Sequence, residues 1–219
     1  MTIADLHTHT TYSSDSVLTP EELVQRARRL DIDILCITDH NVFEESIGIE
    51  SLNIKNKKPL IIRGVELATD NGELLIYGLK NNFWKELISG MQILPSAEKV
   101  ISAVKSFDGV CLWAHPFRKH NVMHYNIDYK NFKDVSIIES LNGHNNEFEN
   151  NMALDYANKH GFKITGGSDA HSLGEVGRKL TLFKETIRTE EEFLSALKTS
   201  EYLPITFEEF KSKEVASFF

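Results

Sequence analysis

Five short polar pieces, rich in histidine and acidic residues, interrupt the apolar runs of this chain. They are Asp5-Leu6-His7-Thr8-His9, Thr38-Asp39-His40, Gly64-Val65-Glu66, His115-Pro116 and Ser168-Asp169-Ala170-His171. Five of the nine histidines lie in these pieces. Polar side chains at the carboxyl ends of parallel strands meet at one edge of an α/β sheet. The pattern therefore predicts that the five pieces form one site.

Apolar runs alternate with helical patterns along the chain. We expect strands at 3–6, 34–38, 60–65, 73–77, 109–114, 135–140, 162–165 and 180–183. Capping boxes that begin at Thr19 and Thr189 predict two helix starts, and further helices are expected near 97–107 and 147–159. Residues 81–95 are expected to be irregular, and a short peripheral helix is expected after 207. This alternation favours an α/β fold with a mostly parallel sheet.

Length and charge limit the classes of protein. A chain of 219 residues can form one domain with a sizeable core, so we expect a single domain, 1–219. The net charge of −8 argues against an extended nucleic-acid surface. Cys36 and Cys111 lie in apolar runs and are expected to be buried thiols. No signal-peptide pattern and no bilayer-length apolar run is seen, which favours a cytoplasmic protein without a membrane partner. The oligomeric state is not indicated.

The residue types of the five pieces suit a metal site. His7 and His9 alternate along one strand, so both imidazoles face one side and can chelate a divalent cation. Asp5 shares that face and is expected to hold an imidazole in one tautomer. The carboxylate of Glu66 can bridge two cations. Each piece alone also fits a surface histidine, and Asp15, six residues after His9, also fits a turn. The five pieces together favour a site for Zn²⁺, Mn²⁺ or Fe²⁺.

The order of these motifs resembles the PHP family, named for polymerase and histidinol phosphatase. From Ile3 to His171 the chain reads D-x-H-x-H, S-x-D, T-D-H, G-x-E, H-P and S-D-A-H. The resemblance implies a distorted (β/α)7 barrel, a metal site at the carboxyl ends of its strands, and phosphoester hydrolysis. It also implies a motif core at 3–172 and a completing segment at 173–219.

The resemblance assigns metal ligands by position. The positions that match one metal ion are His7, His9, Glu66 and Asp169, and those that match a second ion are Asp15, His40 and His171. Glu66 and His115 match part of a third site, but Leu75 stands where its remaining histidine is expected. The resemblance therefore implies two divalent ions and leaves a third open. His115 completes the two-metal site, supports its ligands or contacts the substrate.

The expected function is hydrolysis of a small phosphomonoester, either a nucleotide or a phosphorylated metabolite, by metal-activated water. Asp15 and His40 belong to the expected catalytic centre. Arg118 is the expected phosphate clamp, because a guanidinium matches phosphate oxygens bidentately, although it also fits a solvated loop. Weaker pocket candidates, each of which also fits a surface residue, are Arg178, His120, His124 and His144. His160, before Gly161, fits a helix end.

Other functions remain open. The same family resemblance allows a histidinol-phosphate phosphatase or a protein tyrosine phosphatase. A non-catalytic metal-binding interaction module would need fewer of these ligands. An amidohydrolase also uses barrel-borne histidines and aspartates, but its lysine and second histidine pair are not seen here. A nuclease is disfavoured by the acidic balance.

Overall fold

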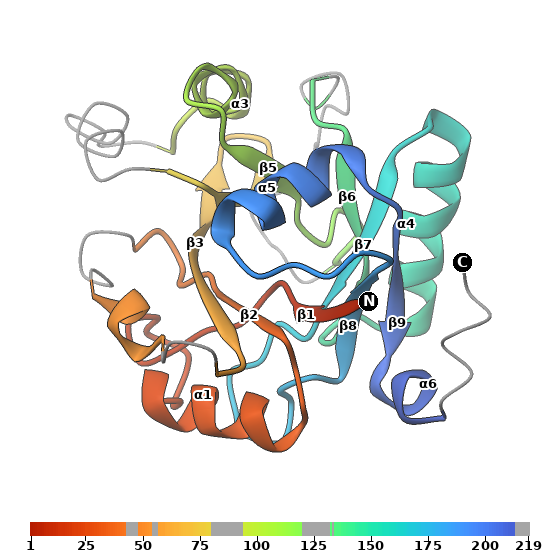
Figure 1. Ribbon diagram of the computed structural model, residues 1–219. Helices are drawn as coiled ribbons and strands as arrows, with labels where there is room; N and C mark the ends of the chain where they lie inside the picture. The colour runs from red at the N-terminus through yellow and green to blue at the C-terminus, as the bar shows by residue number, and fades with distance from the viewer. Residues whose placement is uncertain (43–47, 54–56, 80–93, 120–131, 133, 213–219) are drawn as a thin grey trace.

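Nine β-strands join into one sheet among the residues that the computed structural model describes, which are 1–42, 48–53, 57–79, 94–119, 132 and 134–212 (Figure 1). Their order across the sheet is β7-β6-β5-β4-β3-β2-β1-β8-β9. The strands are β1 Thr2–Asp5, β2 Ile34–Ile37, β3 Leu60–Thr69, β4 Gly72–Tyr77, β5 Val110–Trp113, β6 Ile137–Asn142, β7 Lys163–Gly167, β8 Lys179–Phe183 and β9 Tyr202–Thr206. The last of these strands was not expected from the sequence.

The sheet curls until the segments that follow β1 and β7 meet. His9 N donates to Ala170 O at 3.0 Å, and Asp169 N donates to His7 O at 2.7 Å. Thr8 and Ala170 form a parallel bridge between the same two segments. Strands β8 and β9 continue from β1 beyond this closure. The fold is therefore mixed α/β, with a nearly closed, barrel-like sheet.

Strand direction differs from the mostly parallel expectation. Pairs β1–β2, β2–β3, β5–β6 and β6–β7 are parallel, whereas β3–β4, β4–β5, β1–β8 and β8–β9 are antiparallel. A turn at Asp70 and Asn71, followed by Gly72 at φ +117°, joins β3 to β4 without a helix. Because β4 runs antiparallel to both neighbours, its first residues lie beside the carboxyl ends of β3 and β5.

Helices begin where the sequence supplies caps. The helices are α1 Pro20–Arg29, the 3-10 helix η1 Ile49–Leu52, α3 Ala97–Ser106, α4 Glu147–His160, α5 Glu190–Thr199 and α6 Phe207–Lys211. The capping box expected at Thr19 is present. At Thr189 only half of it forms, because Glu192 Oε2 accepts from Arg188 N. Gly161 ends α4 in the left-handed conformation after His160, as expected.

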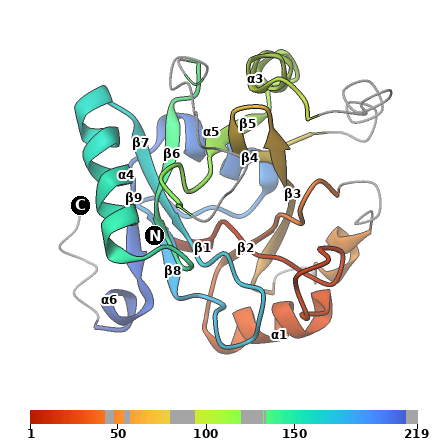
Figure 2. The ribbon, with the colours of Figure 1, turned by 180° about the vertical axis from the view of Figure 1, so that it is seen from behind.

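One apolar cluster fills the interior of the curled sheet, and two others lie between the sheet and its outer helices. The interior cluster includes Leu6, Cys36 and Leu75, and Phe193 and Leu197 of α5 close one end of it. Helix α5 crosses the front of the sheet in Figure 1 and lies behind it in Figure 2. The opposite end of the interior is left for the polar pieces. Cys36 and Cys111 are both free thiols; Cys36 is buried, as expected, whereas Cys111 is only half-buried.

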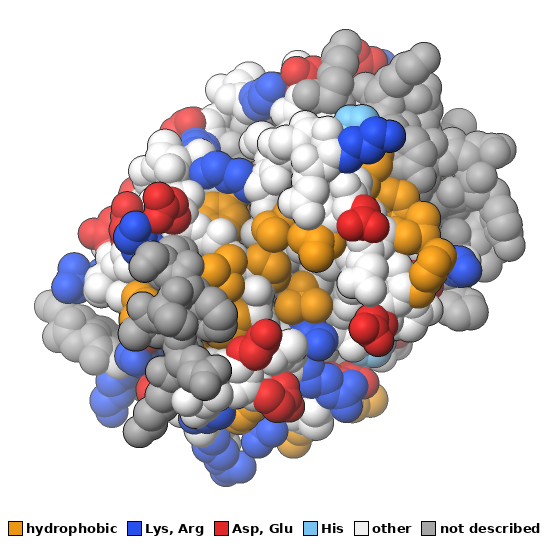
Figure 3. Space-filling view, turned by 90° about the vertical axis from the view of Figure 1, so that its right-hand side faces the viewer, with side chains coloured by type: hydrophobic (Ala, Val, Ile, Leu, Met, Phe, Trp, Pro, Cys, Tyr) orange, Lys and Arg blue, Asp and Glu red, His pale blue; other side chains and the backbone are white. Residues whose placement is uncertain are grey.

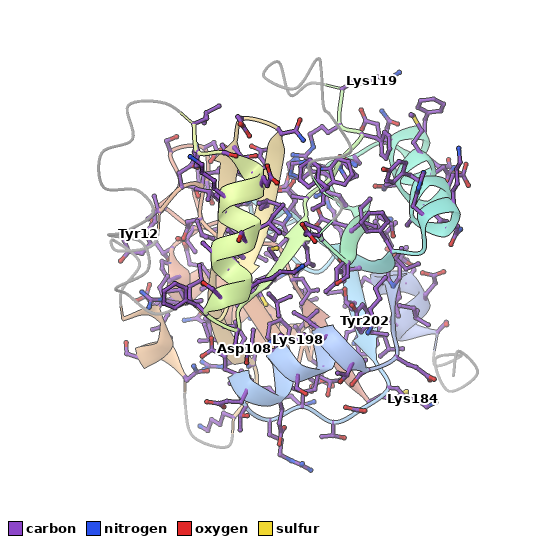
Figure 4. The ribbon with its side chains drawn as sticks, turned by 90° about the horizontal axis from the view of Figure 1, so that it is seen from above. Tyr12, Asp108, Lys119, Lys184, Lys198 and Tyr202 are labelled. Carbon is purple, nitrogen blue, oxygen red and sulfur yellow. The ribbon has the colours of Figure 1, made fainter. Side chains whose placement is uncertain are left out.

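The outer surface mixes side-chain types. On the side shown in Figure 3, hydrophobic side chains gather near the centre and are bordered by both acidic and basic groups. Figure 4 shows Lys198 of α5 beside Asp108, which follows α3, and Lys198 Nζ contacts Asp108 Oδ1 at 2.6 Å. None of the helices in the described part of the chain has the length and apolar content that a membrane crossing requires.

The packing of α5 against one end of the interior cluster gives a test of the fold. Phe193 is fully buried in the interior cluster, so Phe193→Ala should lower the free energy of unfolding by about 3–5 kcal/mol. The control Phe148→Ala removes a ring that is 59% exposed on α4 and should change it by less than about 1 kcal/mol. Urea unfolding followed by circular dichroism measures both, and equal effects would contradict this role for α5.

Candidate metal centre

The metal ligands expected from the sequence converge at one end of the curled sheet, which we call the rim. His7 and His9 follow β1, His40 follows β2, His115 follows β5, and Asp169 and His171 follow β7. Glu66 differs from expectation, because β3 continues through it to Thr69. The parallel bridge between His40 and Glu66 aligns the end of β2 with the middle of β3.

Four of these residues form a buried cluster, which we call the inner group: His7, His9, Glu66 and Asp169. Each offers one ligand atom within 4.8 Å of the others. His7 Nε2 lies 3.1 Å from Glu66 Oε2 and 3.4 Å from Asp169 Oδ1. His9 Nε2 lies 3.3 and 3.1 Å from the same two oxygens. All four side chains are at most 1% exposed, so the group is closed to bulk water.

Three further residues form a more open outer group: Asp15, His40 and His171. Asp15 Oδ2 lies 3.3 Å from His40 Nε2 and 3.5 Å from His171 Nε2. The side chain of Asp15 is 53% exposed, that of His40 29% and that of His171 19%. His40 Nδ1 also lies 3.0 Å from Glu66 Oε2, which joins the outer group to the inner one. The site therefore opens to solvent on the Asp15 side.

Burial and charge act in opposite directions on these groups. Burial would lower the pKa of His7, but the surrounding carboxylates, with Asp169 first, outweigh it and raise that pKa well above its usual range. Burial would raise the pKa of Glu66 and of Asp169, yet the charge of His7 holds both pKa values well below their usual range. For His40, the contact of Nδ1 with the Glu66 carboxylate overcomes burial and raises the pKa to about 9. A divalent cation would stabilise the carboxylates as these protons do and would displace them.

Two buried atoms test whether the inner group suits a cation. His7 Nε2 and Glu66 Oε2 have no hydrogen-bond partner within the described part of the chain, although both are buried. Buried polar atoms are normally satisfied, so this pair calls for another ligand. A divalent cation among two imidazoles and two carboxylates would satisfy both atoms, and such ligands suit Zn²⁺, Mn²⁺ or Fe²⁺.

Glu139 of β6 belongs to the site, although the sequence did not indicate it. Its side chain is 1% exposed, and its Oε1 lies 3.0 Å from His7 Nδ1. Its Oε2 accepts from His115 N at 3.1 Å and from Asn142 Nδ2 at 3.0 Å. A carboxylate on Nδ1 fixes the imidazole so that Nε2 faces a metal. Glu139 is therefore the carboxylate that holds His7 in one tautomer.

Asp5, for which that role was expected, does something else. Its oxygens accept from the backbone N–H groups of Ser168 at 2.9 Å and Gly177 at 3.0 Å, and burial raises its pKa to about 6. Asp5 therefore ties β1 to the loop that carries Asp169. Its contact with His7 is through the backbone, since His7 N donates to Asp5 Oδ1 at 3.4 Å.

Arg118 is anchored within the site. Its Nη2 donates to Asp169 Oδ2 and, at 2.7 Å, to Asn142 Oδ1, while Nε donates to Asn145 Oδ1 at 3.0 Å. Asn142 Nδ2 also donates to Asp169 Oδ2 at 3.2 Å. These bonds hold one oxygen of Asp169 and leave Oδ1 facing His7 and His9. The guanidinium therefore orients Asp169, in addition to any contact with a phosphate.

The remaining candidates fall outside the inner and outer groups. The ring of His144 lies 5.2 Å from that of His171, and its Nε2 lies 3.5 Å from Glu175 Oε1, so it borders the outer group. Arg178 is exposed and donates to Gly174 O. His120 and His124 lie outside the described residues.

Comparison with known proteins gives matches at several levels. A family model described as PHP-associated matches residues 147–202. The uncharacterized protein MJ0417 of Methanocaldococcus jannaschii is 28% identical over 206 residues, covering 89% of this chain and 78% of that protein. The 5'-3' exoribonuclease Rnm of Salmonella typhimurium is 41% identical over 85 residues, covering 35% of this chain and 27% of the exoribonuclease.

Solved structures share the fold at low identity. PsfC from Pseudomonas syringae superposes with a TM-score of 0.71 at 16% identity, covering 100% of this chain and 99% of PsfC. A two-domain protein from Bacteroides vulgatus that contains a predicted PHP-like metal-dependent phosphoesterase gives 0.67 at 17% identity, covering 94% of this chain and 64% of that one. The chain therefore shares the fold of PHP-like proteins, and part of it matches the PHP-associated family model. The PHP-associated match runs from the start of α4 to the start of β9 and contains Asp169 and His171.

Gly167 gives a test of the inner group. A Cβ at Gly167 would lie 2.5 Å from His7 Cβ and 2.8 Å from Glu139 Oε1, so only glycine allows this close approach. Gly167→Ala should displace His7 and weaken Zn²⁺ binding at least about tenfold. Isothermal titration calorimetry measures the affinity. The matched control is Gly174→Ala, whose Cβ would meet no atom within 4 Å, and wild-type affinity in both variants would contradict the assignment.

Proposed function

We propose that this chain is a PHP-family, metal-dependent phosphoesterase that hydrolyses a small phosphomonoester, either a nucleotide or a phosphorylated metabolite. The observation that carries the proposal is the pair of buried, unpartnered atoms, His7 Nε2 and Glu66 Oε2, inside a group of four metal-type ligands. The proposal includes the single domain 1–219 and the distorted (β/α)7 barrel with its site at the rim.

The two ligand groups suit two ions in different surroundings. The inner group would hold one divalent ion away from solvent. The outer group would hold a second ion at the open side, where Asp15 is 53% exposed. Glu66 Oε2 lies within 3.3 Å of nitrogens from both groups, so this carboxylate is placed to serve both ions. Ions bound there supply an activated water and charge stabilisation for phosphoryl transfer.

The chain's own residues prepare this chemistry. Glu139 fixes the ring of His7, and Arg118 and Asn142 fix the carboxylate of Asp169. Such support keeps ligands in place before substrate arrives, which lowers the reorganisation needed during the reaction. The substrate phosphate would enter from the exposed side of Asp15 and His171. Within the described residues no acceptor meets Arg118 Nη1, so this edge of the guanidinium is available to a phosphate oxygen.

A second candidate is hydrolysis of a phosphodiester in nucleic acid. The segment 41% identical to an exoribonuclease favours it, although that segment spans 27% of the exoribonuclease. Against it stand the net charge of −8 and the mixture of acidic and basic groups, with no continuous basic stripe among the described residues on the face in Figure 3. A metal-binding interaction module, and a histidinol-phosphate or protein tyrosine phosphatase, remain the alternatives that the sequence left open.

Substitution of inner-group ligands tests the activity. His9→Ala or Asp169→Ala should lower Mn²⁺-dependent release of phosphate from an aryl phosphate at least about 100-fold, because loss of a ligand exceeds the loss of its supporting contacts. Glu98→Gln, an exposed change on α3, should leave the rate unchanged. Circular dichroism checks that each variant is folded. Full activity in either ligand variant would overturn the proposal.

A substrate panel separates the candidates. The wild-type protein, loaded with Mn²⁺, should release phosphate from mononucleotides or sugar phosphates faster than it shortens a 5'-phosphorylated oligoribonucleotide. Histidinol phosphate and a phosphotyrosine peptide complete the panel. Preferential cleavage of the oligoribonucleotide would instead support the nuclease, and bound metal without turnover of any substrate would support the interaction module.

A further inference from the structure

Glu66 presents its two oxygens to different partners. Oε2 faces the inner and outer groups, whereas Oε1 lies 2.6 Å from His115 Nε2. His115 is 3% exposed, and its backbone N–H is held by Glu139. Its imidazole is therefore fixed on the side of Glu66 that His7 and His9 do not contact.

Glu73 approaches the same place from β4. Its Oε2 lies 3.8 Å from His115 Nε2, and its side chain is 13% exposed. Glu73 also offers a ligand atom within 4.8 Å of those of His40 and Glu66. The backward direction of β4 explains this position, because the start of the strand lies at the rim. The sequence alone, read with a parallel sheet, did not point to Glu73.

Leu75, on the same strand as Glu73, lies in the apolar interior rather than at the rim. It lies two residues after Glu73 and therefore faces the same side of β4. It pairs with Glu66 across the sheet and is fully buried in the apolar interior. The polar rim thus ends between Glu73 and Leu75, so the side chain able to bind a cation on this face of β4 is Glu73.

The distances suit a shared cation. Ligand atoms bound at about 2.1 Å to one tetrahedral or octahedral ion lie about 3.0–3.4 Å apart. The separations of 2.6 Å from His115 Nε2 to Glu66 Oε1 and 3.8 Å to Glu73 Oε2 lie on either side of that range. Glu73 would add a carboxylate charge for this ion that Glu66, shared with the other two groups, cannot supply alone. If His115 and Glu66 form only an ion pair, Glu73 is not needed for it. If the three residues share a cation, loss of Glu73 weakens the binding of that cation.

We propose that Glu73 supplies the metal ligand that Leu75 cannot, so that with Glu66 and His115 it completes the third divalent-ion site that the family resemblance left open. The proposal rests on the proposed function only in that Glu66 is shared. Metal content is measured without turnover, so the two can fail separately.

The test counts bound ions in wild-type protein, Glu73→Gln and the exposed control Glu98→Gln. Each is equilibrated with Mn²⁺, freed of unbound metal and analysed by mass spectrometry, and Mn²⁺ affinities are measured by calorimetry. Glu73→Gln should lose one equivalent, or bind its weakest ion at least about tenfold less tightly. The control should match the wild type. His115→Ala should lose the same equivalent, and the double variant should lose no more.

Anomalous scattering from Mn²⁺-soaked crystals gives a second readout. A peak between Glu73, His115 and Glu66 in the wild type, lost in Glu73→Gln, is the expected result. If Glu73→Gln retains every ion at wild-type affinity, Glu73 is an ion-pair partner only and this proposal is overturned, while the proposed function stands. If the folded wild-type protein binds no Mn²⁺ or Zn²⁺, both are overturned.

Discussion

The rim depends on one buried carboxylate. Glu66 is 1% exposed, yet its oxygens lie 3.1 Å from His7, 3.3 Å from His9, 3.0 Å from His40 and 2.6 Å from His115. These histidines come from the ends of β1, β2 and β5, so a single side chain joins most of the curled sheet. Burying a charge this deeply is unfavourable unless opposite charge compensates it. The four imidazoles, and any cation that replaces their protons, provide that compensation.

Backbone strain is concentrated at the same end of the molecule. Among the described non-glycine residues, positive φ angles occur at Asn41, His115 and Asp169, all at the rim, and at Asp31 and Asp108, which follow helices. A residue in such a conformation costs about 1–3 kcal/mol unless its surroundings hold it. Here Asp169 N donates to His7 O, and His115 N donates to Glu139. The hydrogen bonds of the site therefore stabilise the bends that present its ligands.

Much of the architecture, and the positions of most candidate ligands, could be predicted from local sequence patterns. The strand ends beside His7, His40 and His115 and the capping box at Thr19 depend on a few neighbouring residues, and the structure places them as expected. The predictions that were wrong concern features that depend on pairing between strands far apart in the sequence. The direction of β4 follows from a turn rather than a helix, and without it Glu73 could not be placed at the rim.

Glu139 was missed for the same reason. It lies inside the apolar strand pattern at 135–140, and nothing in its neighbours shows that β6 brings it to His7, 132 residues away in the chain. Asp5 was given the wrong partner because alternation was extended past the end of β1. Arg118 was correctly placed near the site, but its bond to Asp169 could not be inferred before the loops after β5 and β7 were known to meet.

Charge at the rim also affects the binding of a phosphoester. Carboxylates from five residues gather there, in a chain of net charge −8: Asp15, Glu66, Glu73, Glu139 and Asp169. Protons on His7 and His40 and the guanidinium of Arg118 offset part of this negative charge, but the remaining carboxylate charge repels an anionic phosphoester. Divalent cations reverse the local sign of the field. Divalent ions held by these ligands would therefore make the rim more attractive to the phosphoester that we propose as substrate than protons on the same imidazoles can.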